Sequence, residues 1–233
     1  ERLKTQEKTV AVYTHRSTIG MALNPVSQRL ELPLLGAVSH KDFAVQNPFA
    51  WQLWSTSTEE GEFLAAQFKR RGFHRVALIS TEDDWTLAVS TQLRSSLGPK
   101  SEAIVFDENV QPTNTDFRSM LLKLRQAAPD VVFVNVVLPQ IAPLIRQLHQ
   151  NHVSAPLFSN FYVAKKDILE ALGPAGLEGI RYAEIDTALP SLQKQLGLSA
   201  NEPPPGLSVA SYLGTLLIVQ AVRSSQHVSN AEQ

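Results

Sequence analysis

Short apolar runs rich in β-branched residues alternate with amphipathic helical segments along the chain. One unit runs from the apolar segment 74–80 into the helical segment 81–98, and another runs from 130–137 into 139–150. Strands that are apolar at every position are buried on both faces, and the helices between them supply the covering layers. The pattern therefore predicts an α/β fold built on parallel sheets.

The same periodicity predicts the remaining elements. A helix that begins at Ser57 has Glu60 three residues later, which is the spacing of a capping box. In such a box each of the two side chains satisfies a backbone amide at the helix start. Strands are expected at 9–13, 33–37, 75–80, 102–106, 155–160 and 180–185, and helices at 18–30, 84–97, 115–127, 165–172 and 207–224.

The residues that directly follow each strand are the candidates for function, because ligand sites in open parallel sheets form beyond the carboxyl ends of the strands. Ser17 and Thr18 follow the strand at 9–13, and Ser39 follows the strand at 33–37. Hydroxyl groups cap the amides at helix starts, and amides that stay free there attract anions such as carboxylates. The two strand ends are expected either to hold one small carboxylate together or to be simple helix caps.

Basic residues lie beside both strand ends: His15 and Arg16 at the first, and His40 and Lys41 at the second. If these side chains converge, the site favours an anionic ligand. The alternative is that each of them extends into solvent, as long basic side chains usually do.

Acidic residues follow the strand at 75–80, where Glu82, Asp83 and Asp84 are adjacent. Three carboxylates at a strand end could hold Mg²⁺, which binds oxygen ligands. Alternatively, Asp83 and Asp84 lie in the first turn of the next helix, where negative charge complements the helix dipole. The second interpretation is preferred, so no metal site is expected here.

Aromatic residues also follow two strands. Trp85 could cover a bound ligand at the mouth of its strand, or it could be a half-buried packing residue. Phe161 and Tyr162, after the strand at 155–160, could line the same opening.

The composition excludes several functional classes. The chain has 233 residues with 21 basic and 22 acidic side chains, a net charge of −1, so no nucleic-acid partner is expected. It contains no cysteine, which excludes disulfides and thiolate metal sites. Nucleophile-elbow, phosphate-loop and zinc-protease motifs do not occur. Neither a cofactor nor a catalytic residue is therefore expected.

Membrane and export signals are weak in this sequence. The apolar segment 211–222 is shorter than the roughly 20 residues that span a bilayer, so it is expected to be a buried core helix. The first nine residues are charged and lack the apolar region of a secretory signal. Either a mature or truncated form is present, or the protein is cytoplasmic.

Several segments resemble, in their order and spacing, the type I periplasmic solute-binding proteins of the leucine/isoleucine/valine-binding family. The segment NTDFRSMLLKLRQAAPDVVFVN at 114–135 is similar to the family pattern of D-F, a basic residue and P-D-x-V. The segments LELPLLGAVSHKDF, FAWQLWSTSTEEGEFLAAQFKRRGFHRVALISTEDDW, GLEGIRYA and GLSVASYLGTLLIVQAV resemble further family segments. The likeness extends from about residue 9 to residue 224.

The resemblance implies two doubly wound parallel-sheet lobes joined by a hinge and closing over a ligand. Residues 57–183 would form one lobe, and residues 9–56 with 187–225 would form the other. The second lobe is expected to be incomplete, because about two β–α units and the usual C-terminal stretch are not matched.

The resemblance also implies ligand-contacting residues. Ser17 and Thr18 would be carboxylate-binding hydroxyls, while Val38 and Ser39 would meet the amino and carboxyl groups of the ligand. Trp85 would cover the ligand from the other lobe. The family's amino-binding acid would lie near 159–162, but SNFY contains no carboxylate. The complete set of expected ligand-binding residues is Arg16, Ser17, Thr18, Val38, Ser39, Trp85, Phe161 and Tyr162.

The expected function is that of a non-enzymatic, periplasmic or extracytoplasmic receptor for a small carboxylate or amino-acid-like ligand. Its expected partner is an ABC transporter permease or a signalling protein. With Arg16 and His40 nearby and no acid at 159–162, an acidic or non-amino-acid ligand is the specific hypothesis. Two alternatives stay open: the ligand-sensing domain of a receptor or regulator, and a Mg²⁺-dependent enzyme that uses Glu82, Asp83 and Asp84.

Overall fold

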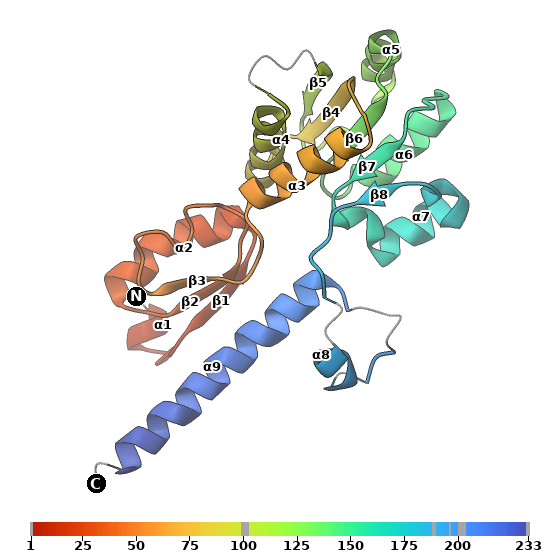
Figure 1. The fold of residues 1–233 in the computed structure, drawn as a ribbon. Helices are drawn as coiled ribbons and strands as arrows, with labels where there is room; N and C mark the ends of the chain where they lie inside the picture. The colour runs from red at the N-terminus through yellow and green to blue at the C-terminus, as the bar shows by residue number, and fades with distance from the viewer. Residues whose placement is uncertain (1, 99–102, 188–189, 196, 200–203, 232–233) are drawn as a thin grey trace. The chain divides into compact units, whose positions relative to one another are not determined.

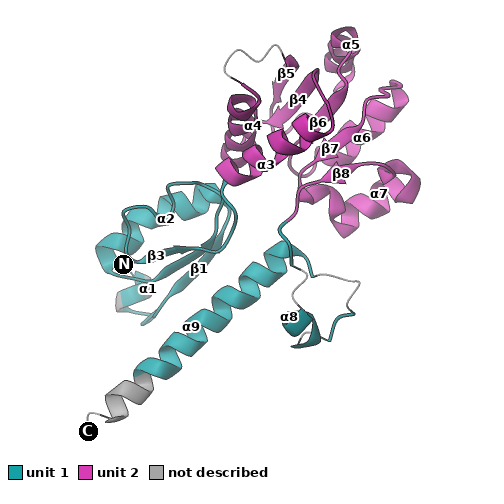
Figure 2. Cartoon of the chain, viewed as in Figure 1, with its two compact units in different colours: residues 1–56, 185–233 teal, residues 57–184 magenta. Residues whose placement is uncertain are grey.

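The computed structural model describes residues 2–98, 103–187, 190–195, 197–199 and 204–231 (Figure 1). The chain forms two compact units (Figure 2). Unit 1 contains residues 1–56 and 185–233, and unit 2 contains residues 57–184. Each unit is described by itself below.

Unit 1 contains a parallel sheet of three strands in the order β1-β2-β3. His15 at the end of β1 is paired with Ala37 at the end of β2, so both strands end at the same edge. The core beneath the sheet is made by Leu34, Val38, Phe43 and Ala50. The elements are α1 (Arg2–Thr5), β1 (Val12–His15), α2 (Ser17–Leu30), β2 (Leu34–Ala37), β3 (Ala50–Gln52), α8 (Pro190–Gln195) and α9 (Gly206–Ala231).

Helix α9 packs on the sheet of unit 1 at a close approach. A Cβ atom at Gly214 would lie 2.7 Å from Cδ2 of Tyr13, and the Tyr13 hydroxyl lies 3.1 Å from Oγ of Ser211. The expectation of a buried core helix is nevertheless wrong for much of its length, since Leu217 and Val219 are exposed. The expectation that it is too short is also wrong. Residues 206–225 are long and apolar enough to cross a membrane, a criterion that many core helices also meet.

Unit 2 contains a five-stranded, all-parallel sheet in the order β5-β4-β6-β7-β8. Its strands are β4 (Val76–Thr81), β5 (Ile104–Val110), β6 (Val131–Asn135), β7 (Leu157–Ser159) and β8 (Arg181–Tyr182). Its helices are α3 (Ser57–Arg70), α4 (Asp84–Leu97), α5 (Arg118–Ala127), α6 (Ile141–Gln150), η1 (Phe161–Ala164) and α7 (Lys166–Leu177).

Two apolar clusters cover the two faces of this sheet. Along β4, Val76 and Leu78 pack with residues of α3 and α4, whereas Ala77 and Ile79 pack with residues of α5 and α6. Successive residues of a strand point to opposite faces, so this alternation places helices on both sides. Continuous apolar strands follow from this double burial, and the prediction of an α/β fold with parallel sheets is confirmed.

Element boundaries agree with the predictions where the hydrophobic periodicity is strong. Helix α4 covers 84–97 as expected, whereas β8 is confined to two residues. Helix α8 and η1 were not expected. Residue 102 of the expected strand 102–106 lies outside the described residues, as do 188–189, 196 and 200–203 of the expected lobe segment 187–225.

Candidate functional site

The ends of β1 and β2 bring Ser17 and Ser39 together in unit 1. Both serines are buried, and the backbone N–H of Ser39 donates to Oγ of Ser17 over 3.2 Å. Neither serine has the helix-cap role that was the alternative expectation. Arg16, not Ser17, occupies the N-cap position of α2, and turns rather than a helix follow Ser39. The Ser17 hydroxyl and the Ser39 backbone N–H therefore meet where β1 and β2 end.

The backbone of Arg16 between β1 and α2 is strained. Its φ and ψ are 78° and 130°, and its side chain makes no cap hydrogen bond. A residue other than glycine rarely adopts positive φ, and such conformations cluster at functional sites. Arg16 is exposed and lies directly between the end of β1 and Ser17.

Thr18 and Val38, the other ligand-binding residues expected in unit 1, differ in exposure. Thr18 is exposed on the first turn of α2. Val38 is fully buried against Gly20 and Gly36, and its carbonyl oxygen already accepts from Nε2 of Gln52 over 2.8 Å. Since a carbonyl has two lone pairs, one acceptor position of Val38 is left for a ligand.

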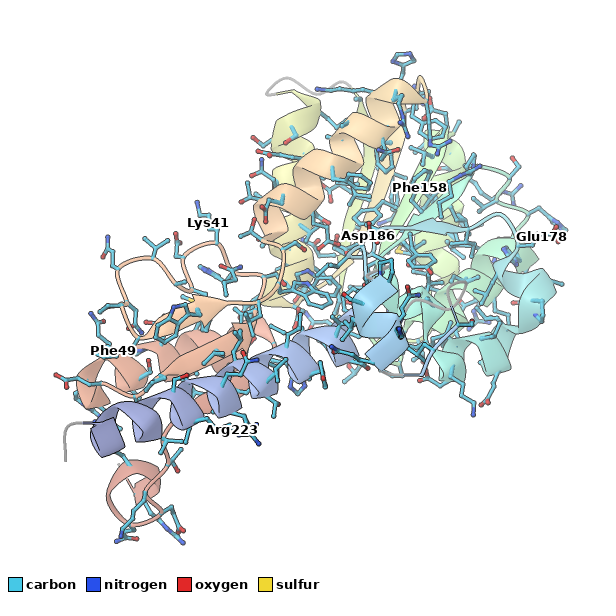
Figure 3. All side chains as sticks on the ribbon, turned by 60° about the horizontal axis from the view of Figure 1, so that its bottom comes forward. Lys41, Phe49, Phe158, Glu178, Asp186 and Arg223 are labelled. Carbon is cyan, nitrogen blue, oxygen red and sulfur yellow. The ribbon has the colours of Figure 1, made fainter. Side chains whose placement is uncertain are left out.

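The basic residues near these strand ends do not form one group. His40 Nδ1 accepts from the backbone N–H of Asp42 and lies 4.0 Å from Oδ2 of that residue. Lys41 is exposed at the periphery of its unit (Figure 3). His15 and Arg16 are both exposed at the end of β1, His15 as the last residue of the strand and Arg16 directly after it.

In unit 2, Trp85, Phe161 and Tyr162 form an aromatic cluster at the carboxyl ends of β4 and β7. The distance between ring centroids is 5.3 Å for Trp85 and Phe161, 5.6 Å for Trp85 and Tyr162, and 4.6 Å for Phe161 and Tyr162. These separations lie within the range of favourable aromatic pairs. The three residues that sequence reasoning selected are thus brought together, although Trp85 is more buried than an open cover would be.

Glu60 is a member of this site that sequence reasoning missed. Its Oε2 accepts a hydrogen bond from Nε1 of Trp85 over 3.1 Å, while its Oε1 is buried without a hydrogen-bond partner. Burial raises the pKa of Glu60 from 4.5 to about 7; the indole hydrogen bond opposes this shift and the charge of Glu184 adds to it. The capping box is therefore not formed by Glu60, whose carboxyl is turned to Trp85.

A buried polar network holds the strand ends that carry the aromatic cluster. Nδ2 of Asn160 donates to Oδ1 of Asn135 and to the carbonyl of Val136, while its Oδ1 accepts from the backbone N–H of Tyr162. Nδ2 of Asn135 in turn donates to Oγ of Ser90 and to the carbonyl of Thr86. Asn160 is therefore committed to holding the turn before Phe161, and it does not replace the acid that the family places near 159–162.

Two of the three acidic residues after β4 accept hydrogen bonds from groups of the protein. Asp83 caps α4, because its Oδ1 accepts from the backbone N–H of Trp85 over 3.1 Å, and the carboxylate of Glu82 accepts from the amide of Gln111. Over the described residues, no three side chains of metal-binding type come together. These contacts favour the capping interpretation over the magnesium one.

Two hollows on unit 2 lie elsewhere. One of about 310 Å³ is lined by α5 and α6 residues that include Asp116, Arg118 and Arg146. Another of about 290 Å³ lies between α3 and β8 beside Phe158. Neither is lined by the aromatic cluster or by Glu60. The expected site residues of unit 2 are thus organised by direct packing rather than around either hollow.

Comparison with known proteins places the chain in a family. The model of the periplasmic binding protein family matches residues 1–233. An amino acid binding protein of Pseudomonas aeruginosa is 23% identical over 121 residues, which are 52% of this chain and 32% of that protein.

Two solved structures are similar in fold. The substrate binding protein LivJ of Streptococcus pneumoniae, in complex with isoleucine, has a TM-score of 0.76 and 17% identity, and the match covers 93% of this chain and 64% of that one. A solute binding protein of an ABC transporter from Rhodopseudomonas palustris, in complex with 4-hydroxybenzoate, has a TM-score of 0.70 and 18% identity, with coverage of 93% and 62%.

The chain spans less than two thirds of the length of each of these proteins. Its parallel-sheet α/β architecture agrees with theirs, and the family model extends over every residue. The chain belongs to the periplasmic binding protein family.

Proposed function

We propose that the protein is a solute receptor that captures a small carboxylate or amino-acid-like ligand between two lobes. Unit 1 and unit 2 are the two lobes, corresponding to residues 9–56 with 187–225 and to residues 57–183. The complete protein acts outside the cytoplasm and delivers its ligand to an ABC transporter permease. Relatives that are named as ABC transporter proteins support transport rather than sensing.

The observation that carries the proposal is the pairing of Ser17 with Ser39 at one strand edge. The strands that precede the two serines, β1 and β2, end side by side. The backbone N–H of Ser39 is already oriented by its hydrogen bond to Oγ of Ser17. Among the described residues, the hydroxyl of Ser39 has no hydrogen-bond partner of its own. A carboxylate accepts hydrogen bonds from hydroxyls and backbone amides, and those bonds are stronger than bonds between neutral groups.

In this proposal each unit contributes a different chemistry. Arg16, Ser17, Thr18, Val38 and Ser39 supply polar groups and positive charge for the carboxylate end of the ligand. Trp85, Phe161 and Tyr162 supply an aromatic surface for its apolar part. A ligand with one carboxylate and one apolar or aromatic group fits both, and isoleucine and 4-hydroxybenzoate each have this composition.

Calorimetry with isoleucine, valine, leucine and 4-hydroxybenzoate tests the proposal. At least one of these solutes is expected to bind, with a negative heat-capacity change from apolar burial. Replacing Ser39 by alanine is expected to weaken binding at least tenfold, because the variant lacks a hydroxyl donor to the carboxylate. A hydrogen bond to a charged group contributes about 1.5–3 kcal/mol of binding free energy.

Trp51→Phe is the matched control for a Trp85→Phe variant, because Trp51 is an exposed residue of β3 that is not one of the expected ligand-binding residues. Trp85→Phe is expected to weaken binding and Trp51→Phe to leave it unchanged. Equal affinities for the Ser39→Ala variant and the parent protein would refute the proposed carboxylate site.

A further inference from the structure

The carboxyl group of Glu60 is buried in unit 2, and one of its two oxygens has no hydrogen-bond partner. Oε2 accepts from the indole N–H of Trp85, and Oε1 is buried without a partner. Buried polar atoms are almost always hydrogen-bonded, so an unpartnered acceptor inside a protein is a feature that requires an explanation. The indole bond ties this group directly to the aromatic cluster.

The charged groups around Glu60 do not neutralise it. From the segment that follows β8, the like charge of Glu184 acts on it. At the N-cap of α4, Asp83 is engaged with the backbone N–H of Trp85. Directly after η1, Lys165 lies over the ring of Tyr162, with Nζ 5.3 Å from the centroid, and so its charge faces that ring. No described cation pairs with the Glu60 carboxyl.

Ionisation of Glu60 therefore changes the cluster itself. An isolated buried carboxylate is costly, and the group is poised to take up or release a proton near neutral pH, since burial raises its pKa to about 7. In the neutral acid, Oε1 carries the proton and Oε2 still accepts from the indole. In the carboxylate, a full negative charge lies against the indole N–H and strengthens that bond.

We propose that Glu60 is a positioning residue that holds the indole of Trp85 and couples ligand binding by the aromatic cluster to its own protonation. The coupling to ligand rests on the function proposed above, whereas the coupling to Trp85 does not. A ligand that carries an ammonium group is favoured by the ionised form, and a ligand that carries only negative charge is favoured by the neutral form.

The first experiment needs no ligand. The chain has three tryptophans, so Trp51→Phe combined with Trp54→Phe leaves Trp85 as the sole indole fluorophore. Its emission is measured from about pH 5 to about pH 9, a range that brackets the ionisation of the carboxyl. The emission is expected to titrate with a midpoint near neutrality, and the Glu60→Gln variant is expected to lose that titration.

Glu62→Gln is the matched control, because Glu62 is an exposed acid on the same helix. It is expected to leave the titration unchanged. A flat emission profile in the parent protein would overturn the proposal, and so would an identical titration in the Glu60→Gln variant. If that variant fails to fold, a flat profile in the parent protein still overturns the proposal.

The second experiment measures the affinities for isoleucine and 4-hydroxybenzoate across the same pH range. Isoleucine is expected to bind several-fold more tightly at the alkaline end, and 4-hydroxybenzoate several-fold more tightly at the acidic end. Glu60→Gln is expected to remove both trends and Glu62→Gln to keep them. If a solute binds with the same pH profile in the parent and in Glu60→Gln, the coupling to ligand is wrong.

Failure of the proposed function has a different signature. In that case neither solute binds the parent protein at any pH, while the fluorescence of Trp85 still titrates through Glu60. A titrating indole with no binding contradicts the receptor role and retains the positioning role.

Discussion

The hydroxyl of Ser17 stabilises the strand edge of unit 1 as well as offering a ligand contact. Replacing Ser17 by alanine leaves the buried N–H of Ser39 without its acceptor. A buried donor that loses its partner costs about 1–3 kcal/mol, so the free energy of unfolding should fall by that amount. Urea denaturation measures the change.

Ala22→Ser is the control for this variant, because Ala22 is exposed on the same helix and serine costs little helix propensity. Its effect is expected to stay within about 0.5 kcal/mol, as for most surface substitutions. If the two variants are equally stable, the hydrogen bond between Ser17 and Ser39 does not hold this edge.

The pH dependence of stability should report Glu60. Its folded pKa of about 7 lies above the ordinary value of 4.5, so the folded protein holds this proton more tightly than the unfolded chain does. The contribution of Glu60 to stability is therefore complete below about pH 4.5 and is lost as the pH rises through about 7. The shift corresponds to a loss of about 3 kcal/mol.

Glu60→Gln removes this loss. Relative to the parent protein, the variant should gain stability progressively as the pH is raised from mildly acidic to mildly alkaline, and denaturant unfolding at both ends measures the difference. A constant difference between the two proteins across this range would show that the carboxyl does not titrate with folding.

At the residue scale, the sequence predicted site members by their place after a strand, and it missed the one that lies on a helix. Trp85, Phe161 and Tyr162 follow strands and do cluster. Glu60 was assigned to a capping box, so its spacing to the buried apolar residues of the same helix was not considered. It lies four residues before Leu64 and eight before Phe68, on the buried stripe of α3. A carboxylate in register with a core stripe is a signal of a buried acid.

At the scale of elements, α3 and α4 approach closely through Gly61. A Cβ atom at this position would lie 2.7 Å from Cβ of Gln92 and 2.8 Å from the backbone nitrogen of Leu93. Alanine would favour the helix by about 1 kcal/mol, but overpacking typically costs about 1–3 kcal/mol. Because a backbone atom must move, we expect Gly61→Ala to destabilise the protein by about 1–2 kcal/mol.

Thermal unfolding of Gly61→Ala beside Ala66→Ser checks this expectation. Ala66 is exposed on the same helix, so its variant should lose only the small helix propensity of serine. A melting temperature for Gly61→Ala at or above that of the parent protein would mean that the two helices can separate without cost.

The bounds of strands and helices with a clear apolar pattern could be predicted from the sequence. The bounds of elements that depend on contacts with neighbouring elements could not. Strand β4 and helix α4 were located within one or two residues, because every strand position is buried and the helix carries one clear apolar stripe. Strand β8 pairs with β7 at only two positions, and this limit depends on the neighbour rather than on the sequence 180–185. Hydrophobic periodicity likewise could not predict that Leu217 on α9 is exposed, because it does not show which apolar residues of a helix are covered by other elements.

At the scale of the whole molecule, the order of segments predicted the family, and the match to residues 1–233 confirms it. The arrangement of the two units as lobes about a ligand stays a prediction. It requires that the units move relative to each other when the ligand binds, as in hinge closure of related folds.

The chain is well suited to a direct test of this requirement, because it contains no cysteine that would react with a label. Lys41→Cys in unit 1 and Glu178→Cys in unit 2 replace exposed residues, and spin labels at the two positions report the distance between the units. The distance distribution is measured without ligand and with each solute that binds in the calorimetric panel. The account predicts that the bound solute shifts and narrows this distribution, and that Ser39→Ala abolishes the effect. A distribution that is unchanged at saturating ligand would contradict capture between two lobes.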